Sequence, residues 1–197
     1  MHITGVLLAA GRAQRFGGDK LLARFADGPD AGTAVGVVAY RNLRAALDDV
    51  IVAVRPADEA LRRVFEALDA RVVVAQRADE GLGASIAAAV QASGAVDGYV
   101  LALADMPFIQ PSTIARVARQ LAGGASIVAP RYEGRRGHPV GFSSAHRDAL
   151  VALTGDEGAR SIVEREQQAL VLIDVDDAGI VRDIDVPEPG LLAFCAP

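Results

Sequence analysis

The chain has 197 residues, a formal net charge of −5 and a hydrophobic content of 51%, which argues against disorder. This length suits one sizeable core, so we expect one domain spanning residues 1–197. The only cysteine, Cys195, excludes an internal disulfide and a thiolate cluster for zinc or iron–sulfur. The acidic balance, without a block of Lys or Arg, argues against nucleic acid as a partner, because phosphate-backbone binding depends on a basic surface.

The sequence also gives no sign of a membrane partner. No apolar run approaches the length needed to cross a bilayer. Residues 1–9 lack the basic start and the small-residue cleavage site of a signal peptide. We therefore expect a cytoplasmic protein.

Short apolar runs alternate with amphipathic stretches through most of the chain. The runs are rich in Val, Ile and Leu without clean alternation, which is typical of strands covered on both faces. They occupy residues 3–9, 50–54, 71–75, 99–104 and 126–129. Helical spacing marks residues 33–47 and 112–122, the second with Ser112 as a candidate cap. The alternation predicts a three-layer α/β fold with a mostly parallel central sheet.

The last third has a different pattern. Residues 131–138 are polar and broken by glycines, and they join two apolar runs like a long hairpin. Helical segments follow at 144–153, where we expect His146 to be exposed, and at 157–168. Two strand-like runs, 169–175 and 180–185, end the pattern, and we expect a small antiparallel addition to the sheet here.

A loop of small residues follows the first predicted strand. The segment Leu8-Ala9-Ala10-Gly11 has little side-chain bulk, so its backbone N–H groups can approach an anion, and Arg15 and Lys20 supply positive charge. The spacing matches neither the P-loop nor the dinucleotide fingerprint G-x-G-x-x-G. The pattern L-A-A-G-x(3)-R-F-G-G-x-K therefore predicts a different kind of triphosphate site. The alternative is that Arg15 and Lys20 are ordinary solvated side chains of a surface loop.

Five segments, in chain order, resemble the MobA-like nucleotidyltransferases, and more closely their branch of molybdenum cofactor cytidylyltransferases. They are LAAGRAQRFGGDK (8–20), GLGASIAAAV (81–90), LALADMPFI (101–109), GHPVGF (137–142) with GDEGARSIV (155–163), and DIDVPE (183–188). The resemblance implies a Rossmann-like nucleotidyltransferase fold. It also implies transfer of CMP from CTP to Mo-molybdopterin with release of pyrophosphate. A molybdoenzyme or its chaperone would be a further partner.

Asp105 is the first candidate ligand of a metal ion. It follows a buried predicted strand at the carboxyl edge of the sheet, where open α/β folds bind ligands. A divalent cation is a natural partner for a carboxylate that faces a triphosphate, and a helix cap is the alternative. The resemblance implies Asp185 as a second ligand of the same Mg²⁺. Asp183 is the fallback, because Val186 stands where the family more often has Thr.

The resemblance assigns the other candidates as well. They are catalytic (Arg15, Lys20, Asp105), nucleotide-binding (Leu8, Ala9, Ala10, Gly11, Arg15, Lys20, Gly83, Ser85) and acceptor-binding (His138, Asp156, Arg160). Structural alternatives remain open, because Ser85 can open and cap a helix and His138 can be a strand histidine with satisfied hydrogen bonds. Asp156 can likewise pair with Arg160 one helical turn later.

The first loop also carries a prediction about the base. In the family the GTP-using members tend to have LAGG, whereas the cytidylyl branch has LAAG. A methyl group at Ala10 would take up room beside the base and favour a pyrimidine. Rival functions are a transferase of the same fold that uses GTP or a sugar phosphate, a nicotinamide-dependent oxidoreductase, and a non-catalytic nucleotide-binding chaperone of a molybdoenzyme.

Overall fold

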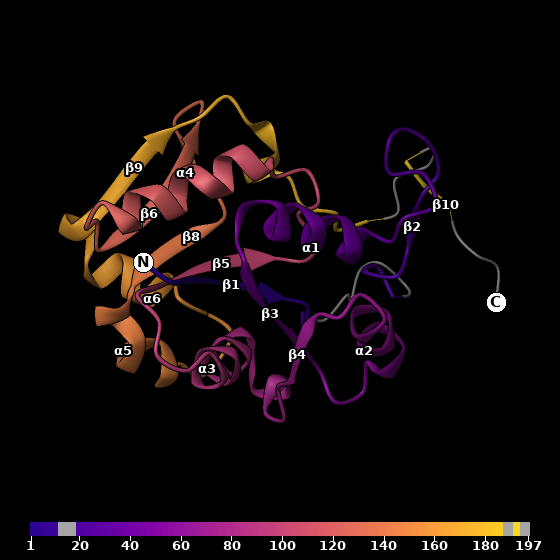
Figure 1. The fold of residues 1–197 in the computed structure, drawn as a ribbon, viewed down its shortest axis with the longest axis horizontal. Coiled ribbons are helices and arrows are strands. Elements are labelled where there is room, and N and C mark those ends of the chain that lie inside the picture. Colours follow the sequence, from indigo (N-terminus) through magenta and orange to yellow (C-terminus); the bar gives the residue numbers. More distant parts are fainter. Residues whose placement is uncertain (12–18, 187–190, 194–197) are drawn as a thin grey trace.

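An eight-stranded sheet runs through the centre of the molecule (Figure 1), with the order β4-β3-β1-β5-β8-β6-β7 and with β9 paired to β6. The computed structural model describes residues 1–11, 19–186 and 191–193. The strands of this sheet are β1 (Ile3–Leu8), β3 (Asp49–Val54), β4 (Arg71–Val74), β5 (Gly98–Leu103), β6 (Ile127–Tyr132), β7 (Arg135–Arg136), β8 (Val140–Ser143) and β9 (Leu170–Asp174). A second, two-stranded sheet consists of β2 (Arg24–Phe25) and β10 (Leu192–Ala193).

Helices cover both faces of the large sheet. They are α1 (Val35–Ala46), α2 (Glu59–Glu66), α3 (Leu82–Ala92), α4 (Pro111–Ala122), α5 (Arg147–Val151) and α6 (Arg160–Arg165), with short 3-10 turns η1 (Ala78–Glu80), η2 (Ser144–His146), η3 (Gln167–Ala169) and η4 (Ala178–Val181). The helices α1, α2 and α4 share one apolar cluster, and α3, α5 and α6 share another. Figure 1 shows α1 and α4 on the face of the sheet opposite to α3 and α5. The predicted three-layer α/β architecture is therefore confirmed.

The central strands send alternate side chains into two cores. In β1, Leu7 belongs to the core beneath α1, whereas Val6 and Leu8 belong to the core beneath α3. Because helices cover both faces, apolar residues are favoured at nearly every position of such a strand. This explains the continuous hydrophobic runs in the sequence. Among the described residues, no helix is long and apolar enough to cross a membrane.

Pairing is parallel among β4, β3, β1 and β5, and β9 is parallel to β6. It is antiparallel where β8 lies between β5 and β6, and where β7 pairs with β6. The predicted hairpin is thus confirmed, and so is a small antiparallel addition, which β7 and β8 form; the run predicted over residues 169–175 instead forms the parallel strand β9. The strand predicted over residues 180–185 is wrong. The turn η4 occupies its start, and Ile184 donates its N–H to the carbonyl oxygen of Asp105 (2.9 Å) in place of a strand ladder.

Two further predictions about local structure are wrong. The helix α4 begins at Pro111 with Gln110 at its N-cap, so Ser112 lies inside the helix. Proline starts a helix well, because the N–H that it lacks has no partner in the first turn. His146 is buried rather than exposed. Its Nε2 lies 2.8 Å from the Ser126 hydroxyl, which gives this buried ring a polar partner.

The start of α3 packs directly on the loop that precedes α6. The helix begins at Leu82, with Gly81 at the N-cap, so the prediction that Ser85 opens it is wrong. At a φ of 119°, Gly81 adopts a conformation that other residues rarely reach, and an added Cβ would lie 2.3 Å from the backbone of Gly155. Gly83 donates its N–H to the Gly155 carbonyl oxygen (2.9 Å). Glycines therefore allow the two backbones to touch.

We expect Gly83→Ala to destabilise the protein, although alanine is favoured over glycine inside a helix by about 1 kcal/mol. The added Cβ would lie 2.7 Å from the carbonyl oxygen of Thr154, which is backbone and cannot swing away. Overpacking of this kind costs about 1–3 kcal/mol, so the steric effect wins. Urea denaturation measures the change in the free energy of unfolding.

Gly36→Ala in α1 is the matched control, because its added Cβ would meet Leu21 at 3.4 Å, an ordinary contact. Its free energy of unfolding should be unchanged or slightly higher. If Gly83→Ala and Gly36→Ala lower the free energy of unfolding equally, the contact with Thr154 is not the cause of the destabilisation.

Candidate active site

Three carboxylates meet beyond the carboxyl end of β5. Asp105 lies two residues after this strand, and the backbone hydrogen bond from Ile184 holds residues 183–185 beside it. Asp105, Asp183 and Asp185 each offer one oxygen, and these oxygens lie within 4.8 Å of one another. An oxygen-only set of donors suits a hard divalent cation such as Mg²⁺ or Mn²⁺. The structure thus brings together both predicted metal ligands and the fallback candidate.

The negative charges of the three carboxylates repel one another. Burial raises the pKa of Asp183 above its ordinary value, and the neighbouring charges of Asp185 and Asp105 raise this pKa further. The backbone hydrogen bond and the charge of Lys20 only partly offset these effects. A cation bound among the three side chains would relieve the repulsion. The donor set therefore fits a divalent metal ion electrostatically as well as chemically.

Lys20 bridges two members of the cluster. Its Nζ lies 2.7 Å from Oδ2 of Asp105 and 3.3 Å from Oδ1 of Asp185. Burial lowers the pKa of this ammonium, but the hydrogen bonds and charges of the two carboxylates outweigh burial and raise that pKa above its ordinary value. Lys20 is therefore charged at neutral pH, although only 7% of it is exposed. It is also the only lysine in the sequence.

A buried aspartate that the sequence reasoning missed positions one side of the cluster. Asp177 accepts hydrogen bonds at Oδ2 from the backbone N–H of Gln110 (2.9 Å) and from the hydroxyl of Thr113 (2.7 Å). Its Oδ1 accepts one from the N–H of Gly179 (3.0 Å). These bonds tie η4 to the start of α4, just ahead of residues 183–185. The sequence Asp-Ala-Gly at residues 177–179 could have identified Asp177, because it is typical of an Asx turn.

A cavity of about 440 Å³ lies beside the carboxylates, between the first loop and the start of α3. Six of the predicted site residues line it, namely Leu8, Ala10, Gly11, Lys20, Asp105 and Asp156, the last of which was predicted to bind the acceptor. Asp79, which was not predicted as a site residue, lines it too. The charge pattern, a lysine and an acidic cluster at one end of a cavity with a loop of small residues, suits a triphosphate bound with a cation.

The other predicted nucleotide-binding residues lie elsewhere. Ala9 is buried next to the cavity lining. Gly83 and Ser85 lie within α3 and do not line the cavity, and the Ser85 hydroxyl has no hydrogen-bond partner among the described residues. Arg15 falls outside the described residues, so its role stays a prediction.

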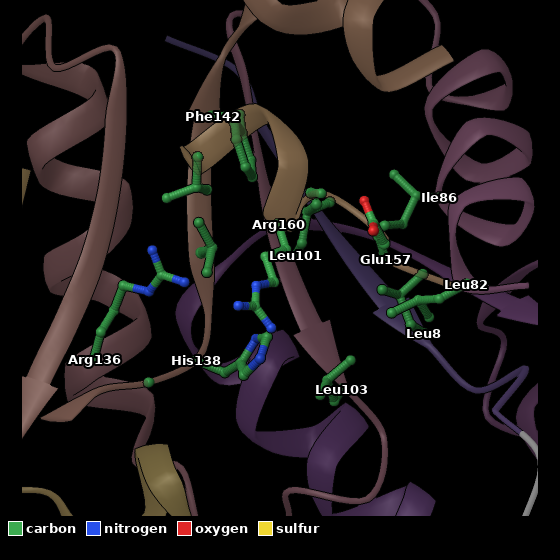
Figure 2. A pocket seen from close by; sticks show the side chains of 14 residues that line it. Leu8, Leu82, Ile86, Leu101, Leu103, Arg136, His138, Phe142, Glu157 and Arg160 are labelled. Atoms are coloured by element: carbon green, nitrogen blue, oxygen red, sulfur yellow. The ribbon is translucent and has the colours of Figure 1, made fainter. Parts of the chain in front are cut away.

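A second pocket, of about 230 Å³ and mostly apolar, adjoins the first cavity (Figure 2). The residues common to both linings are Leu8, Leu82 and Leu103. Two predicted acceptor-binding residues, His138 and Arg160, line this second pocket. The cavity beside the carboxylates and the apolar pocket therefore share a wall.

The ion pair that we considered between Asp156 and Arg160 does not form. The helix α6 begins only at Arg160, and the Nε of this residue lies 2.6 Å from Oε1 of Glu164, one turn later. Asp156 lines the cavity beside the carboxylates instead. Its side chain also faces α3, since a Cβ added at Gly81 would lie 2.5 Å from Oδ1 of Asp156. The predicted acceptor-binding residues are thus divided between the two cavities.

His138 offers a neutral imidazole to the apolar pocket. Its backbone N–H donates to the carbonyl oxygen of Ile180 (2.9 Å), and its peptide bond to Pro139 is cis. Burial lowers the pKa of the imidazole, the charge of Asp105 raises it less, and the charge of Arg136 lowers it further. The Nδ1 atom is enclosed and has no hydrogen-bond partner among the described residues. The neutral imidazole of His138 can therefore form a hydrogen bond to a ligand.

A doubly covered parallel sheet with a loop of small residues and an acidic cluster at its carboxyl edge is the arrangement of a nucleotide-binding transferase. The sequence profile of the family described as "MobA-like NTP transferase domain" matches residues 5–170. The chain therefore belongs to this family of nucleotidyltransferases, and the resemblance found in the sequence is confirmed at the level of the family.

Known relatives align over nearly the whole chain. Purine catabolism protein PucB of Bacillus subtilis is 30% identical over 198 residues, which cover 95% of this chain and 93% of PucB. Nicotine blue oxidoreductase of Paenarthrobacter nicotinovorans is 29% identical over 195 residues, 94% of this chain and 93% of that protein. The crystal structure of Rv0371c from Mycobacterium tuberculosis has a TM-score of 0.80 at 30% identity, with 94% and 93% of the two chains covered. Its complex with manganese has a TM-score of 0.73 at 28% identity, with 95% and 91% covered.

Proposed function

We propose that this protein transfers CMP from CTP to the terminal phosphate of Mo-molybdopterin, which gives molybdopterin cytosine dinucleotide and pyrophosphate. The observation that carries the proposal is the carboxylate cluster, bridged by Lys20, at one end of a cavity that shares a wall with an apolar pocket. A nucleoside triphosphate with its metal ion suits the polar cavity. The pterin end of the acceptor suits the apolar pocket.

In this reaction an oxygen of the acceptor phosphate forms a bond to the α-phosphorus, and the bond from that phosphorus to the departing pyrophosphate breaks. The acceptor oxygen is already ionised at neutral pH, so no side chain has to remove a proton from it. The task of the protein is to align two polyanions that repel each other. The N–H groups of the first loop and the ammonium of Lys20 would bind the triphosphate, with Arg15 as the further predicted cation.

Asp105 and Asp185, with Asp183 beside them, would hold the divalent cation. We propose Mg²⁺ for this role, and the manganese complex of the related Rv0371c supports a divalent ion in general. When bound, such an ion neutralises phosphate oxygens and stabilises the pyrophosphate as it leaves. His138, Arg160 and Asp156 would contact the acceptor from the walls of the two cavities.

Ala10 would make the site selective for CTP. The side chain is 5% exposed and lines the nucleotide cavity, so its methyl group takes up space there. We expect the unmodified protein to prefer CTP to GTP, and we expect Ala10→Gly to raise its relative activity with GTP by about tenfold, the effect of roughly one methyl group in a binding site. Initial rates of pyrophosphate release with each nucleotide measure the ratio. A preference for GTP in the unmodified protein would contradict the assignment of the base.

The name of the Paenarthrobacter relative favours a second candidate, an oxidoreductase. The first loop of this chain departs from the G-x-G-x-x-G spacing of nicotinamide cofactor sites. The two candidates separate in one experiment, in which the protein is incubated with molybdopterin, Mg²⁺ and each of the four ribonucleoside triphosphates. A cytidine-containing product found by mass spectrometry supports the transferase. Oxidation of NADPH without release of pyrophosphate, in a parallel incubation with nicotine blue, supports the oxidoreductase.

A further inference from the structure

The apolar pocket has the size and the lining of a site for a ring system. Its walls include Ile86 of α3 on one side, and Leu101 of β5 and Phe142 of β8 on the other. Its volume of about 230 Å³ lies below the roughly 300–1,000 Å³ typical of pockets for drug-sized ligands. One bicyclic heterocycle, with the rest of the ligand outside, suits these dimensions.

The polar groups of the pocket carry opposite charges on opposite sides. Glu157 supplies its only carboxylate among the described residues, and Figure 2 shows this carboxylate beside Ile86. Across the pocket, Figure 2 shows the guanidinium of Arg160 beside the ring of His138, with Arg136 on the same side. The ligand that fits best therefore has hydrogen-bond donors on one edge and acceptors on the other.

A 2-amino-4-oxo heterocycle has this pattern. Its N3–H and 2-amino groups form two parallel donors, to which one carboxylate can bind through both oxygens, as it does to a guanidinium. The other side of a pterin ring carries acceptors, which arginine and histidine donors can satisfy. Because the His138 imidazole is neutral and its Nδ1 has no partner among the described residues, it can bond to a ring nitrogen or to an N–H group.

We propose that Glu157 is the residue that selects a pterin as the acceptor, by binding the N3–H and 2-amino edge of a ring held in the apolar pocket. This inference rests on the proposed function, in which the acceptor is a pterin, and deepens it. Through the wall formed by Leu8, Leu82 and Leu103, the pocket adjoins the cavity of Asp105. A phosphate attached to the ring would extend past this wall toward the nucleotide.

Two fluorescent probes test the proposal by direct binding titration. Pterin has the 2-amino group, whereas lumazine has an oxygen in its place. We expect the unmodified protein to bind pterin about tenfold more tightly than lumazine, because an oxygen at this position offers the Glu157 carboxylate no donor. In Glu157→Gln the affinity for pterin should fall by about tenfold and the preference for pterin should disappear.

Glu164→Gln is the matched control, because Glu164 carries the same charge and pairs with Arg160 without lining the pocket. Its affinity for pterin should stay within about twofold of the unmodified protein, since exposed ion pairs contribute little. Equal affinities for the two probes in the unmodified protein, or an unchanged preference in Glu157→Gln, would overturn the proposal. A thermal unfolding curve of each variant shows whether the fold is intact.

Turnover separates this inference from the proposed function. If CMP transfer occurs but Glu157→Gln leaves the KM for the acceptor unchanged, the role of Glu157 fails and the function stands. If pterin binding depends on Glu157 but CTP gives no pyrophosphate, the pocket assignment stands and the cytidylyl transfer fails.

Discussion

Asp105→Asn should lower the rate of CMP transfer by about 100- to 1,000-fold, the size of effect seen when one group that stabilises transition-state charge is removed. A neutral carboxamide is a much weaker ligand for Mg²⁺ than a carboxylate. The change also removes the charge to which Lys20 bonds at 2.7 Å. Steady-state release of pyrophosphate at saturating CTP measures the loss.

Asp174→Asn is the control for this variant. Asp174 ends β9, is exposed, and forms an ion pair with Arg131 on the neighbouring strand. Its replacement removes one negative charge but leaves the carboxylate cluster intact, so the rate should stay within about twofold. A non-catalytic nucleotide-binding chaperone would keep its function in Asp105→Asn, and such tolerance would rule out our proposal that this chain is an enzyme.

Lys20→Met should have two opposite effects. Transfer should slow by about 100-fold, because the triphosphate loses a charge that would assist the departure of pyrophosphate. At the same time, the affinity for Mn²⁺ without nucleotide should rise, because the ammonium no longer competes for Asp105 and Asp185. Electron paramagnetic resonance titration of free Mn²⁺ measures the affinity.

Arg24→Met is the matched control for Lys20→Met. Arg24 is an exposed cation near the same loop, and it donates to the carbonyl oxygen of Gly32 rather than to the carboxylate cluster. The variant Arg24→Met should leave the affinity for Mn²⁺ unchanged. If Lys20→Met binds Mn²⁺ no more tightly than Arg24→Met does, competition between the ammonium and the metal ion is refuted.

Much of the parallel sheet could be predicted from the sequence because burial on both faces leaves a strong local mark. An uninterrupted apolar run as short as residues 50–54, and rich in β-branched residues, is typical of a strand covered on both faces. The neighbourhood of Asp105 followed from the same logic, because the carboxyl ends of parallel strands face ligands. The bridge from Lys20 was harder to foresee, since Lys20 and Asp105 lie on segments far apart in the sequence.

The failures arose where tertiary contacts overrode a local pattern. Residues 180–185 contain three β-branched residues, a composition typical of a strand, but the Asx turn of Asp177 and the hydrogen bond of Ile184 to Asp105 fix another conformation. The spacing of Asp156 and Arg160 suggested one helix, but Gly158 has a φ of 56°, and α6 starts only after it. The role that we propose for Glu157 could not be predicted, because the pocket that it lines is formed by residues of α3, β5 and β8, which meet only in the folded chain.

The bridging ammonium of Lys20 has a practical consequence. Arginines do not acylate under mild conditions, so Lys20 is the only side chain in the sequence that an amine-selective reagent can acylate. In the folded protein its ammonium is buried and bonded to two carboxylates, which shield it from such a reagent. The extent of acylation at Lys20 would therefore report when the ammonium separates from the carboxylates.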